Sequence, residues 1–436
     1  MKKGTRMLKK IALLLTVVLA MTGCGSVSNG NTKGSETVAD TGTSKIVFWQ
    51  VDNNESEETL AKQQALFNQI KEETGIEIEF VRLPFSAYDD KCNTALSSKT
   101  GPDIIGVNGT TLGSFADKGY LVDIGEYLEN STRLSKDDFA PGLWGNAMLN
   151  GKYYGLPRDT GTRALLYNKT ELSKAGMTLG EEVTWEEFRE AARLLTQDIN
   201  NDGTTDKFGF GYAGGSTWSL LHEALATFAI QTGDDIFTED GKPNVNSDGM
   251  KKAVSLIKEL EDMGACPQDS VTVTDANLVT EMFLAGTIGM VQSNMAGYQN
   301  IKNKNPEFEV GIALLKEKTI GSSLGGWTLA VSQKAQNPED CFKVLEYLYQ
   351  PENIVLFTNA MPAVLEANED ILANPETKLY ADVLPYSKVP IPTAPTTPET
   401  AMIIQSHFQN IILGTEDVNK GMDAAQEEIL ELMGLQ

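Results

Sequence analysis

The chain has 436 residues, with 60 Asp and Glu against 36 Lys and Arg, which gives a formal net charge of −24. This balance argues against nucleic-acid binding, because neutralising phosphates requires clustered Lys and Arg. Only two histidines occur, His222 and His407, so we expect neither a His-rich metal site nor a catalytic Ser-His-Asp triad. The length allows two or three domains, with ample apolar residues for a core.

The amino terminus resembles the signal of bacterial lipoproteins. A basic stretch is followed by the apolar run Ile11–Ala20, which is too short for a bilayer span of about 20 residues but fits a signal-peptide core. The run ends in Met21-Thr22-Gly23-Cys24, similar to the lipobox, whose cysteine carries diacylglycerol and palmitate in that class of proteins. We therefore expect a signal peptide over 1–23 and a protein anchored through Cys24 at the extracellular face of the cell membrane. The alternative is a buried apolar helix with an incidental cysteine.

A polar segment separates this signal from the folded part. Residues 24–44 are rich in Gly, Ser, Thr and Asn, a composition typical of a flexible tether. Beyond it, Cys92, Cys266 and Cys341 are an odd number of widely spaced cysteines, so we expect packing rather than a disulfide framework to stabilise the fold.

The remaining chain alternates strand and helix patterns. Two strand patterns, a helix between them, a second helix and a third apolar run predict a mainly parallel sheet covered by helices. Thr184 and Glu187 have the spacing of a capping box that begins another helix. In chain order, the predicted elements are strand 45–49, helix 57–73 ending at Gly75, strand 76–80, helix 86–98, strand 104–107, helix 185–196, and a helical segment 401–435 with a break near Gly414.

Several segments, taken in order, resemble family 1 of the extracellular solute-binding proteins, the maltose-binding-protein-like receptors of carbohydrate ABC importers. They include GPDIIGVN at 101–108, GKYYGLPRDTGTRALLYNKTELSKAG at 151–176, FLAGTIGMVQSNMAGY at 283–298 and GGWTLAVSQKAQNPEDCFKVLEYL at 325–348. The resemblance spans nearly all of residues 45–436. It implies an α/β, two-lobed periplasmic-binding-protein-like fold of type II, in which each lobe is a mainly parallel sheet flanked by helices.

The resemblance also implies where the chain crosses between lobes. Crossings are expected near 156–160, 322–326 and Pro362. The N-terminal lobe would then comprise 45–157 plus 322–361, and the C-terminal lobe 158–321 plus 362–436. A ligand would bind in the cleft between the lobes, which closes on it by a hinge motion.

Sugars present flat apolar faces to aromatic rings and hydroxyl groups to Asp, Asn and Arg. The carboxyl ends of strands in an open α/β sheet are where ligands bind, which makes Trp49, Asn53 and Asn108 candidates. The alternatives are a core role for Trp49 and a turn role for Asn53. Asp159 and Arg163 lie at the first crossing and would either form a salt bridge or reach sugar hydroxyls.

Four further candidates come from the C-terminal lobe and the second crossing. Trp218 follows a Gly-rich loop and would form a wall of the second lobe, and Trp327 follows Gly325-Gly326. Asn294 and Tyr298 fall where the family places a stacking aromatic, although the best match puts Ala296 at the stacking position. Trp144 and Trp185 are assigned to packing.

A calcium loop is the sharpest metal motif. Gly203 stands at position 6 of a loop that has the oxygen spacing of an EF-hand start, although Gly209 replaces the bidentate glutamate at position 12. The alternative is an Asx-rich turn without an ion, and any calcium would be structural. The oxygen-bearing positions are Asp198, Asn200, Asp202, Thr204 and Asp206.

The sequence therefore favours a monomeric, non-enzymatic lipoprotein that captures a sugar or oligosaccharide and delivers it to the permease and ATPase subunits of an ABC importer. It requires no cofactor. The alternatives are a receptor for a non-sugar solute, a secreted glycoside hydrolase that uses two carboxylates, and a cell-surface adhesive protein.

Overall fold

The structure is a computed structural model that describes residues 44–52, 55–98, 101–139, 141–238 and 241–435. The predicted signal peptide, Cys24 and the tether up to residue 43 lie outside the described residues. Ser44, which we placed in the tether, instead begins the first strand. None of the helices in the described ranges is both long and apolar enough to cross a membrane.

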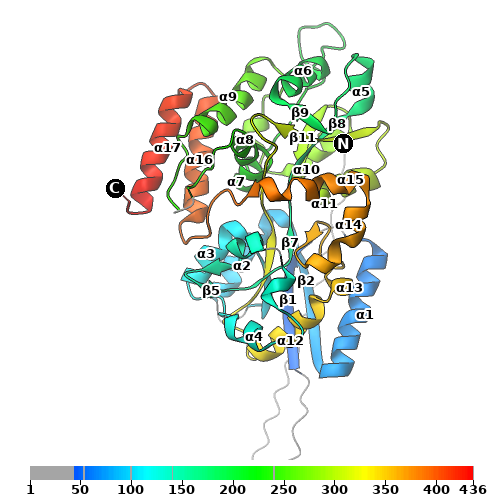
Figure 1. The fold of residues 1–436 in the computed structure, drawn as a ribbon, viewed down its shortest axis with the longest axis vertical. Helices are drawn as coiled ribbons and strands as arrows, with labels where there is room; N and C mark the ends of the chain where they lie inside the picture. The colour runs from blue at the N-terminus through cyan, green and yellow to red at the C-terminus, as the bar shows by residue number, and fades with distance from the viewer. Residues whose placement is uncertain (1–43, 53–54, 99–100, 140, 239–240, 436) are drawn as a thin grey trace, which may run out of the picture. The chain divides into compact units, whose positions relative to one another are not determined.

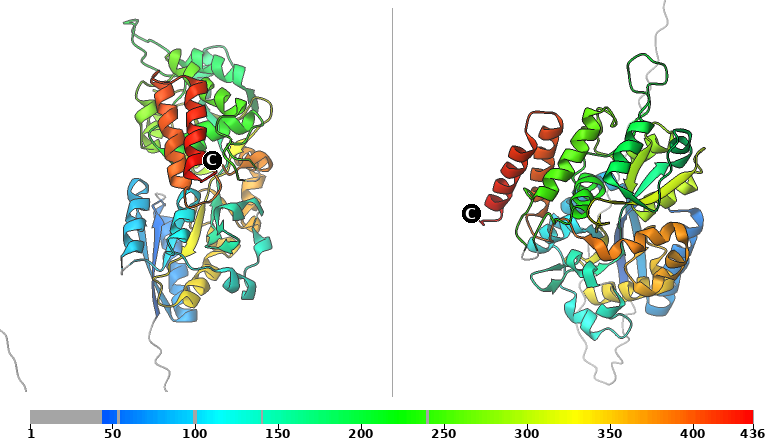
Figure 2. Two further views of the ribbon diagram at one scale, coloured as in Figure 1. Left: turned by 90° about the vertical axis from the view of Figure 1, so that its left-hand side faces the viewer. Right: turned by 45° about the horizontal axis from the view of Figure 1, so that its top comes forward.

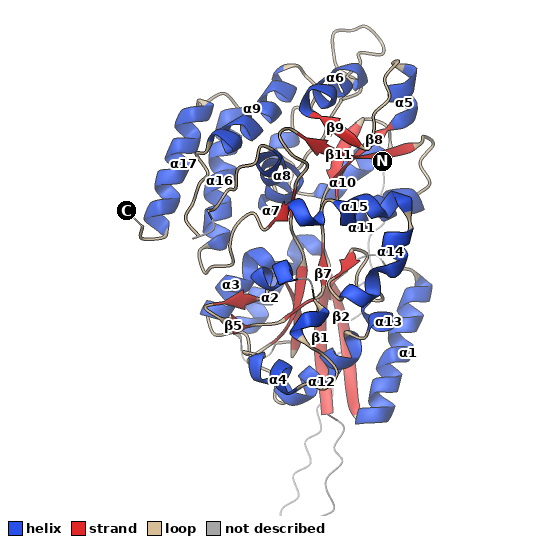
Figure 3. Ribbon diagram, viewed as in Figure 1, coloured by secondary structure: helices blue, strands red, loops and turns tan. Residues whose placement is uncertain are grey.

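The first sheet has the strand order β2-β1-β3-β13-β6. The strands β1, β2 and β3 run parallel, as the alternating sequence pattern predicts, and β13 inserts antiparallel to β3 and β6. We call this sheet and the helices packed around it the N-terminal lobe (Figures 1 and 3). Its strands are β1 Ser44–Val51, β2 Ile76–Leu83, β3 Ile104–Asn108, β6 Leu156–Pro157 and β13 Trp327–Val331, with the small hairpin β4 Met148–Leu149 and β5 Lys152–Tyr153.

The predicted helices of this lobe are present with bounds within a few residues. Gly75 ends the first helix in the left-handed conformation, at φ 76°, and its N–H bonds to the carbonyl of Lys71. The helices are α1 Glu57–Thr74, α2 Phe85–Ser97, α3 Gly109–Asp117, α4 Gly125–Asn130, α12 Pro338–Leu348 and α13 Pro351–Ile354, with short 3-10 turns η1 Lys136–Asp138 and η2 141–146.

The second sheet has the order β10-β8-β11-β9, and its pairing differs from the prediction. The central strand β8 runs antiparallel to both β10 and β11, and only β11 and β9 are parallel. All five residues of β8 are buried, so its apolar run predicts a central strand but carries no information on direction. The strands are β8 Ala164–Asn168, β9 Glu182–Thr184, β10 Met290–Ser293 and β11 Val310–Lys316.

Helices surround this second sheet, and together they form what we call the C-terminal lobe. The helices α16 and α17 lie side by side in both views of Figure 2, with the break at Gly414 (φ 75°) between them, as predicted. The helices are α5 Lys169–Lys174, α6 Trp185–Leu195, α7 Thr217–Leu220, the π-helix η3 Leu221–Leu225, α8 Ala226–Gln231, α9 Asp248–Asp262, η4 Ser270–Thr272, α10 Ala276–Leu284, α11 Met295–Asn303, α14 Glu369–Ala373, α15 Pro375–Asp382, η6 Leu384–Tyr386, α16 Thr397–Ile412 and α17 Val418–Leu432. The short helix η5 Leu365–Asn368 instead packs against α13 and the apolar cluster of the N-terminal lobe.

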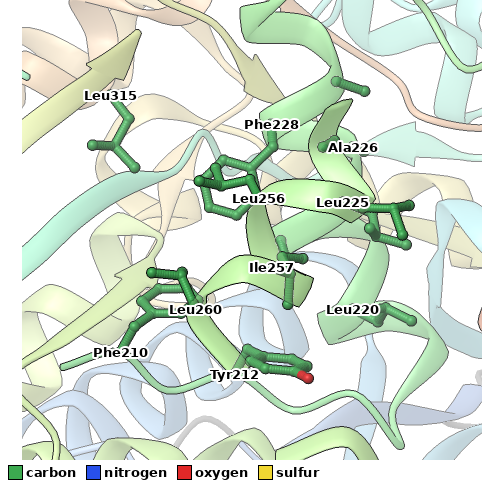
Figure 4. Packing of buried hydrophobic residues seen from close by; sticks show 14 of the residues in the cluster. Phe210, Tyr212, Leu220, Leu225, Ala226, Phe228, Leu256, Ile257, Leu260 and Leu315 are labelled. Atoms are coloured by element: carbon green, nitrogen blue, oxygen red, sulfur yellow. The ribbon is translucent and has the colours of Figure 1, made fainter. Parts of the chain in front are cut away.

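The largest apolar cluster stabilises the C-terminal lobe. It joins the buried faces of α6, α8 and α9 to the second sheet and includes Phe210, Phe228 and Leu260, which Figure 4 shows from close by. Trp185 is buried in this cluster, and its indole donates to Gln231 at 2.7 Å, in agreement with its assignment to packing. Cys92, Cys266 and Cys341 are buried free thiols.

The predicted crossings lie beside one another in two small ladders. β7 Asp159–Thr160 pairs with β14 Met361–Pro362, and β12 Ser322–Ser323 pairs with β15 Ser387–Lys388. Gly161 and Gly325 exchange backbone hydrogen bonds of 2.9 and 3.1 Å, which joins the first crossing to the second. The side chain of Leu384 packs against apolar clusters of both lobes. The lobe boundaries at 157/158, 321/322 and 361/362 stay predictions.

Candidate functional site

A pocket opens beside the crossings, and its walls come from both lobes. The space between its lining atoms is about 290 Å³ when open solvent at the mouth is included, and about one water molecule fits between the walls in this arrangement. The N-terminal lobe contributes residues from the start of α3 and from η2, whereas the C-terminal lobe contributes α7 and the π-helix η3. The lining residues are Gly109, Thr110, Asn146, Trp218, Leu221, His222, Leu324, Gly325, Gly326, Val389, Pro390 and Ile391.

Trp218 and His222 form the wall of this pocket in the C-terminal lobe. Ser216 caps α7 by accepting from the N–H of Ser219, which presents Trp218 in the first turn. The helix then widens into the π-helix Leu221–Leu225, a feature that occurs often at functional sites. The rings of Trp218 and His222 lie 3.9 Å apart between centroids with their planes inclined by 36°, so the imidazole lies over one face of the indole.

Arg163 reaches the same place from the first crossing. Its side chain is 3% exposed, its Nη1 donates to the carbonyl of Gly161, and its Nε has no hydrogen-bond partner. The backbone N–H of Arg163 is held by the hydroxyl of Ser322, which fixes the residue against the second crossing. A methyl group built on Gly325 would lie 3.0 Å from Arg163 Nη1, 3.2 Å from His222 Nδ1 and 3.2 Å from Trp218 Cζ2. These three side chains therefore converge on one point next to the pocket.

Burial sets the charges of this cluster. It lowers the pKa of His222 well below its usual value, and the nearby Arg163 charge adds to the effect, so His222 is neutral. Burial also lowers the pKa of Arg163 to about 10, which leaves the guanidinium charged at neutral pH. Glu223 is partly exposed at the surface, but desolvation of its carboxyl raises its pKa to about 7 against the opposing effect of Arg163.

Asp159 has a different partner from the one predicted. Its carboxylate pairs with Arg158 at 2.6 Å and also accepts from the N–H of Trp327 and the hydroxyl of Thr358. Of the two predicted roles, the ion pair between Asp159 and Arg163 is not formed, because Asp159 is instead bonded to Arg158, Trp327 and Thr358. With its oxygens bonded to protein groups, Asp159 holds the crossings together.

Asn108 lies next to the pocket but caps a helix. Its Oδ1 accepts from the N–H groups of Thr110 and Thr111, and its Nδ2 donates to Asp89 at 2.9 Å. The position was predicted from the carboxyl end of β3, and the two following residues, Gly109 and Thr110, are the ones that line the pocket.

The two predicted tryptophans of the N-terminal lobe each pack against an apolar cluster of that lobe and are not among the residues that line the pocket. Trp49 does not end its strand, since β1 continues to Val51, and it is partly buried against the cluster that includes Tyr88. Trp327 makes an edge-to-face contact with Tyr88 at 5.5 Å between centroids. Asn53 lies outside the described residues.

Asn294 and Tyr298 also have partners of their own. Asn294 caps α11 by accepting from the N–H of Gly297 at 2.9 Å. Tyr298 is buried, and its hydroxyl donates to Glu376 at 2.6 Å, which raises its pKa after the larger effect of burial. Neither residue is among those that line the pocket.

In the candidate calcium loop, side-chain oxygens accept backbone N–H groups. Asp198 accepts from Asp202 and Gly203, and Asp206 accepts from Ile199. In the part of the chain that the structure describes, no group of three or more His, Cys, Asp or Glu side chains is arranged to hold a metal ion. This pattern is that of the Asx-rich turn, and calcium binding remains a prediction.

A second, more open hollow lies on the C-terminal lobe, around Lys174, Lys207 and Lys304. The first two lysines pair with Glu171, and Lys304 pairs with Glu281. The positive charges of these three lysines are therefore balanced by carboxylates of the protein. The pocket beside Gly325 is therefore the stronger candidate site.

His222 is the main site residue that the sequence analysis missed. It lies four residues after Trp218, and this helical spacing could have indicated that the two rings share a face. The wall at Val389–Ile391 belongs to a Pro-rich segment whose position no local pattern predicts.

Comparisons with known proteins identify the family of this chain. The sequence model of the bacterial extracellular solute-binding proteins matches residues 53–355, and the chain belongs to that family. A binding protein of Brucella abortus (strain 2308) is 26% identical over 369 residues, covering 81% of this chain and 86% of the relative. The galactooligosaccharide-binding protein of Bacillus subtilis (strain 168) is 22% identical and covers 97% of both chains.

Solved structures show the same fold. An ABC transporter solute-binding protein of Thermotoga lettingae TMO, bound to α-D-tagatose, superposes with a TM-score of 0.77 at 24% identity. The match covers 89% of this chain and 99% of the other. The predicted class, a two-lobed α/β fold of the type II periplasmic binding proteins, is confirmed, with the second sheet more mixed than expected.

Proposed function

We propose that this protein captures a sugar or short oligosaccharide in the pocket beside Gly325 and delivers it unchanged to the permease of an ABC importer. The observation that carries the proposal is the wall made by Trp218 and His222, beside which Arg163 holds an unpaired nitrogen. A flat aromatic face binds the apolar side of a sugar ring, and charged or polar nitrogens bind its hydroxyls.

The relatives support the same class of ligand. The B. subtilis relative is named for galactooligosaccharides, and the T. lettingae protein was solved with a ketohexose. The pocket lies between two lobes connected by short ladders, which fits a receptor that closes around its ligand by a hinge motion.

Thermal unfolding with a panel of mono- and oligosaccharides tests the proposal. A ligand that binds the folded state raises the unfolding temperature, and a receptor does so without generating new reducing ends. Stabilisation by an amino acid or polyamine, with no response to any saccharide, would contradict the sugar assignment. New reducing ends would indicate hydrolysis instead.

We also propose that the mature protein is a monomer held at the outer face of the membrane by lipid on Cys24. Replacing this residue, Cys24→Ala, should block lipid attachment and shift the protein from the detergent phase to the aqueous phase in a partition experiment. An unchanged partition would argue against the lipid anchor.

A further inference from the structure

The guanidinium of Arg163 is a buried positive charge beside the pocket, next to the lining residue Gly325. Among the described residues, no carboxylate lies within ion-pairing distance of Arg163, whose Nη1 donates to the neutral carbonyl of Gly161. Glu223 is near enough to act on this charge electrostatically, but desolvation raises the pKa of its carboxyl to about 7, so it balances the charge only in part at neutral pH. A buried charge without a close partner is destabilising, and such charges are normally paired with an opposite charge or with a ligand.

Other unpartnered polar atoms surround this charge. His222 Nδ1 is buried without a hydrogen-bond partner, and it converges with Arg163 Nη1 on the same point beside Gly325. The hydroxyl of Tyr380 is also buried and unpartnered. Glycine at position 325 allows Arg163 and His222 to approach the backbone this closely, because a Cβ there would lie only 3.0–3.2 Å from each of them.

We propose that this cluster is a subsite for the carboxylate of an acidic sugar, such as a uronic acid. A carboxylate neutralises Arg163 and accepts charge-assisted hydrogen bonds from it, whereas a hydroxyl group accepts a bond but leaves the charge unbalanced. Neutral His222 supplies a second donor, and its stacking on Trp218 places an aromatic face beside the charged group. The proposal rests on the proposed function, because it specifies which sugars the same pocket selects.

Isothermal titration calorimetry with paired probes tests this inference. D-galacturonate and D-glucuronate are compared with D-galactose and D-glucose at equal ionic strength. We expect one uronate to bind at least tenfold more tightly than its neutral parent. A neutral parent that binds as well as its uronate would overturn the inference.

Variants separate the subsite from the general charge of the protein. Arg163→Gln should remove the preference for the uronate, and Arg163→Lys, which keeps the charge, should retain part of it if the glutamine variant folds poorly. Lys388→Gln is the matched control, because Lys388 neighbours the pocket wall but pairs with Asp235. The preference should persist in this control, and its loss there would show that surface charge, not Arg163, selects the anion.

The outcomes distinguish this inference from the proposed function. Binding of a neutral oligosaccharide without any uronate preference would remove the acidic-sugar subsite and leave the sugar receptor intact. Binding of a non-sugar solute alone would remove both.

Discussion

At the scale of single residues, the two tryptophans Trp218 and Trp327 have separable roles. Trp218 lines the pocket, so Trp218→Ala should weaken binding of the ligand found by thermal screening by tenfold or more, or about 1.4 kcal/mol. Its free energy of unfolding should change little, because the side chain is only partly buried. Calorimetry and urea unfolding measure the two effects.

Trp327 provides the matched comparison. It packs against Tyr88, and Arg158 lies 5.7 Å from its ring centroid, so Trp327→Ala should lower the free energy of unfolding by about 2–3 kcal/mol. Loss of affinity in this variant with unchanged stability would show that the ligand contacts Trp327 instead.

Because of Glu223, we expect the affinity for an acidic ligand to depend on pH. Its pKa is raised to about 7, so the carboxyl is mostly neutral at pH 6 and mostly ionised at pH 8, where its charge opposes a bound carboxylate. His222 stays neutral, and Arg163 and Tyr380 stay protonated across this range, since their pKa values lie outside it. Uronate affinity should therefore be at least about threefold higher at pH 6 than at pH 8.

The control for this effect is Glu223→Gln, which cannot ionise. Its uronate affinity should be the same at both pH values. A persistent pH dependence in this variant would assign the effect to another group.

Among the helices and loops, the capping box of α6 should make a measurable contribution to stability. Thr184 accepts from the N–H of Glu187, and Glu187 accepts from the N–H of Thr184. Thr184→Ala should lower the free energy of unfolding by about 1 kcal/mol, whereas Thr184→Ser should have a much smaller effect because it keeps the hydroxyl. Equal losses in the two variants would show that the methyl group, not the cap, matters.

The 198–206 loop gives a second prediction at this scale. If it binds calcium, adding calcium to chelator-treated protein should raise the unfolding temperature, and Asp198→Asn with Asp202→Asn should abolish the rise. No rise in the unmodified protein would identify the loop as a hydrogen-bonded turn alone.

Elements defined by local signals were predicted well from the sequence. The apolar period of α1 with its stop at Gly75, the capping box at Thr184, and the break at Gly414 are present. These features are determined by residues close together in the chain, so they can be recognised in a single sequence. The direction of β8 was missed because it depends on which distant strands pair with it.

The difference between local and long-range determinants also explains which site residues were predicted from the sequence and which were not. Trp218 was predicted as a cleft wall from its Gly-rich loop, and it lines the pocket. The carboxyl ends of strands correctly indicated the region of Asn108 but not its role, because helix capping competes for the same polar side chains. The unpaired state of Arg163 depends on distant segments meeting at Gly325, which no local pattern encodes.

Across the two lobes, the segments that cross between them also hold the residues beside the pocket in place. Asp159 and Arg158 fasten the first crossing, and Gly161 and Gly325 join it to the second. Since the pocket is lined from both lobes, ligand binding should favour the closed arrangement and protect the crossings from hydrogen exchange.

The most direct measurement is a crystal structure of the protein with the saccharide that gives the largest thermal shift. We expect an intact sugar beside Gly325, with a ring face on Trp218 and an oxygen within hydrogen-bonding distance of Arg163. A saccharide bound elsewhere, or cleaved, or absent from this pocket at saturating concentration, would contradict this expectation.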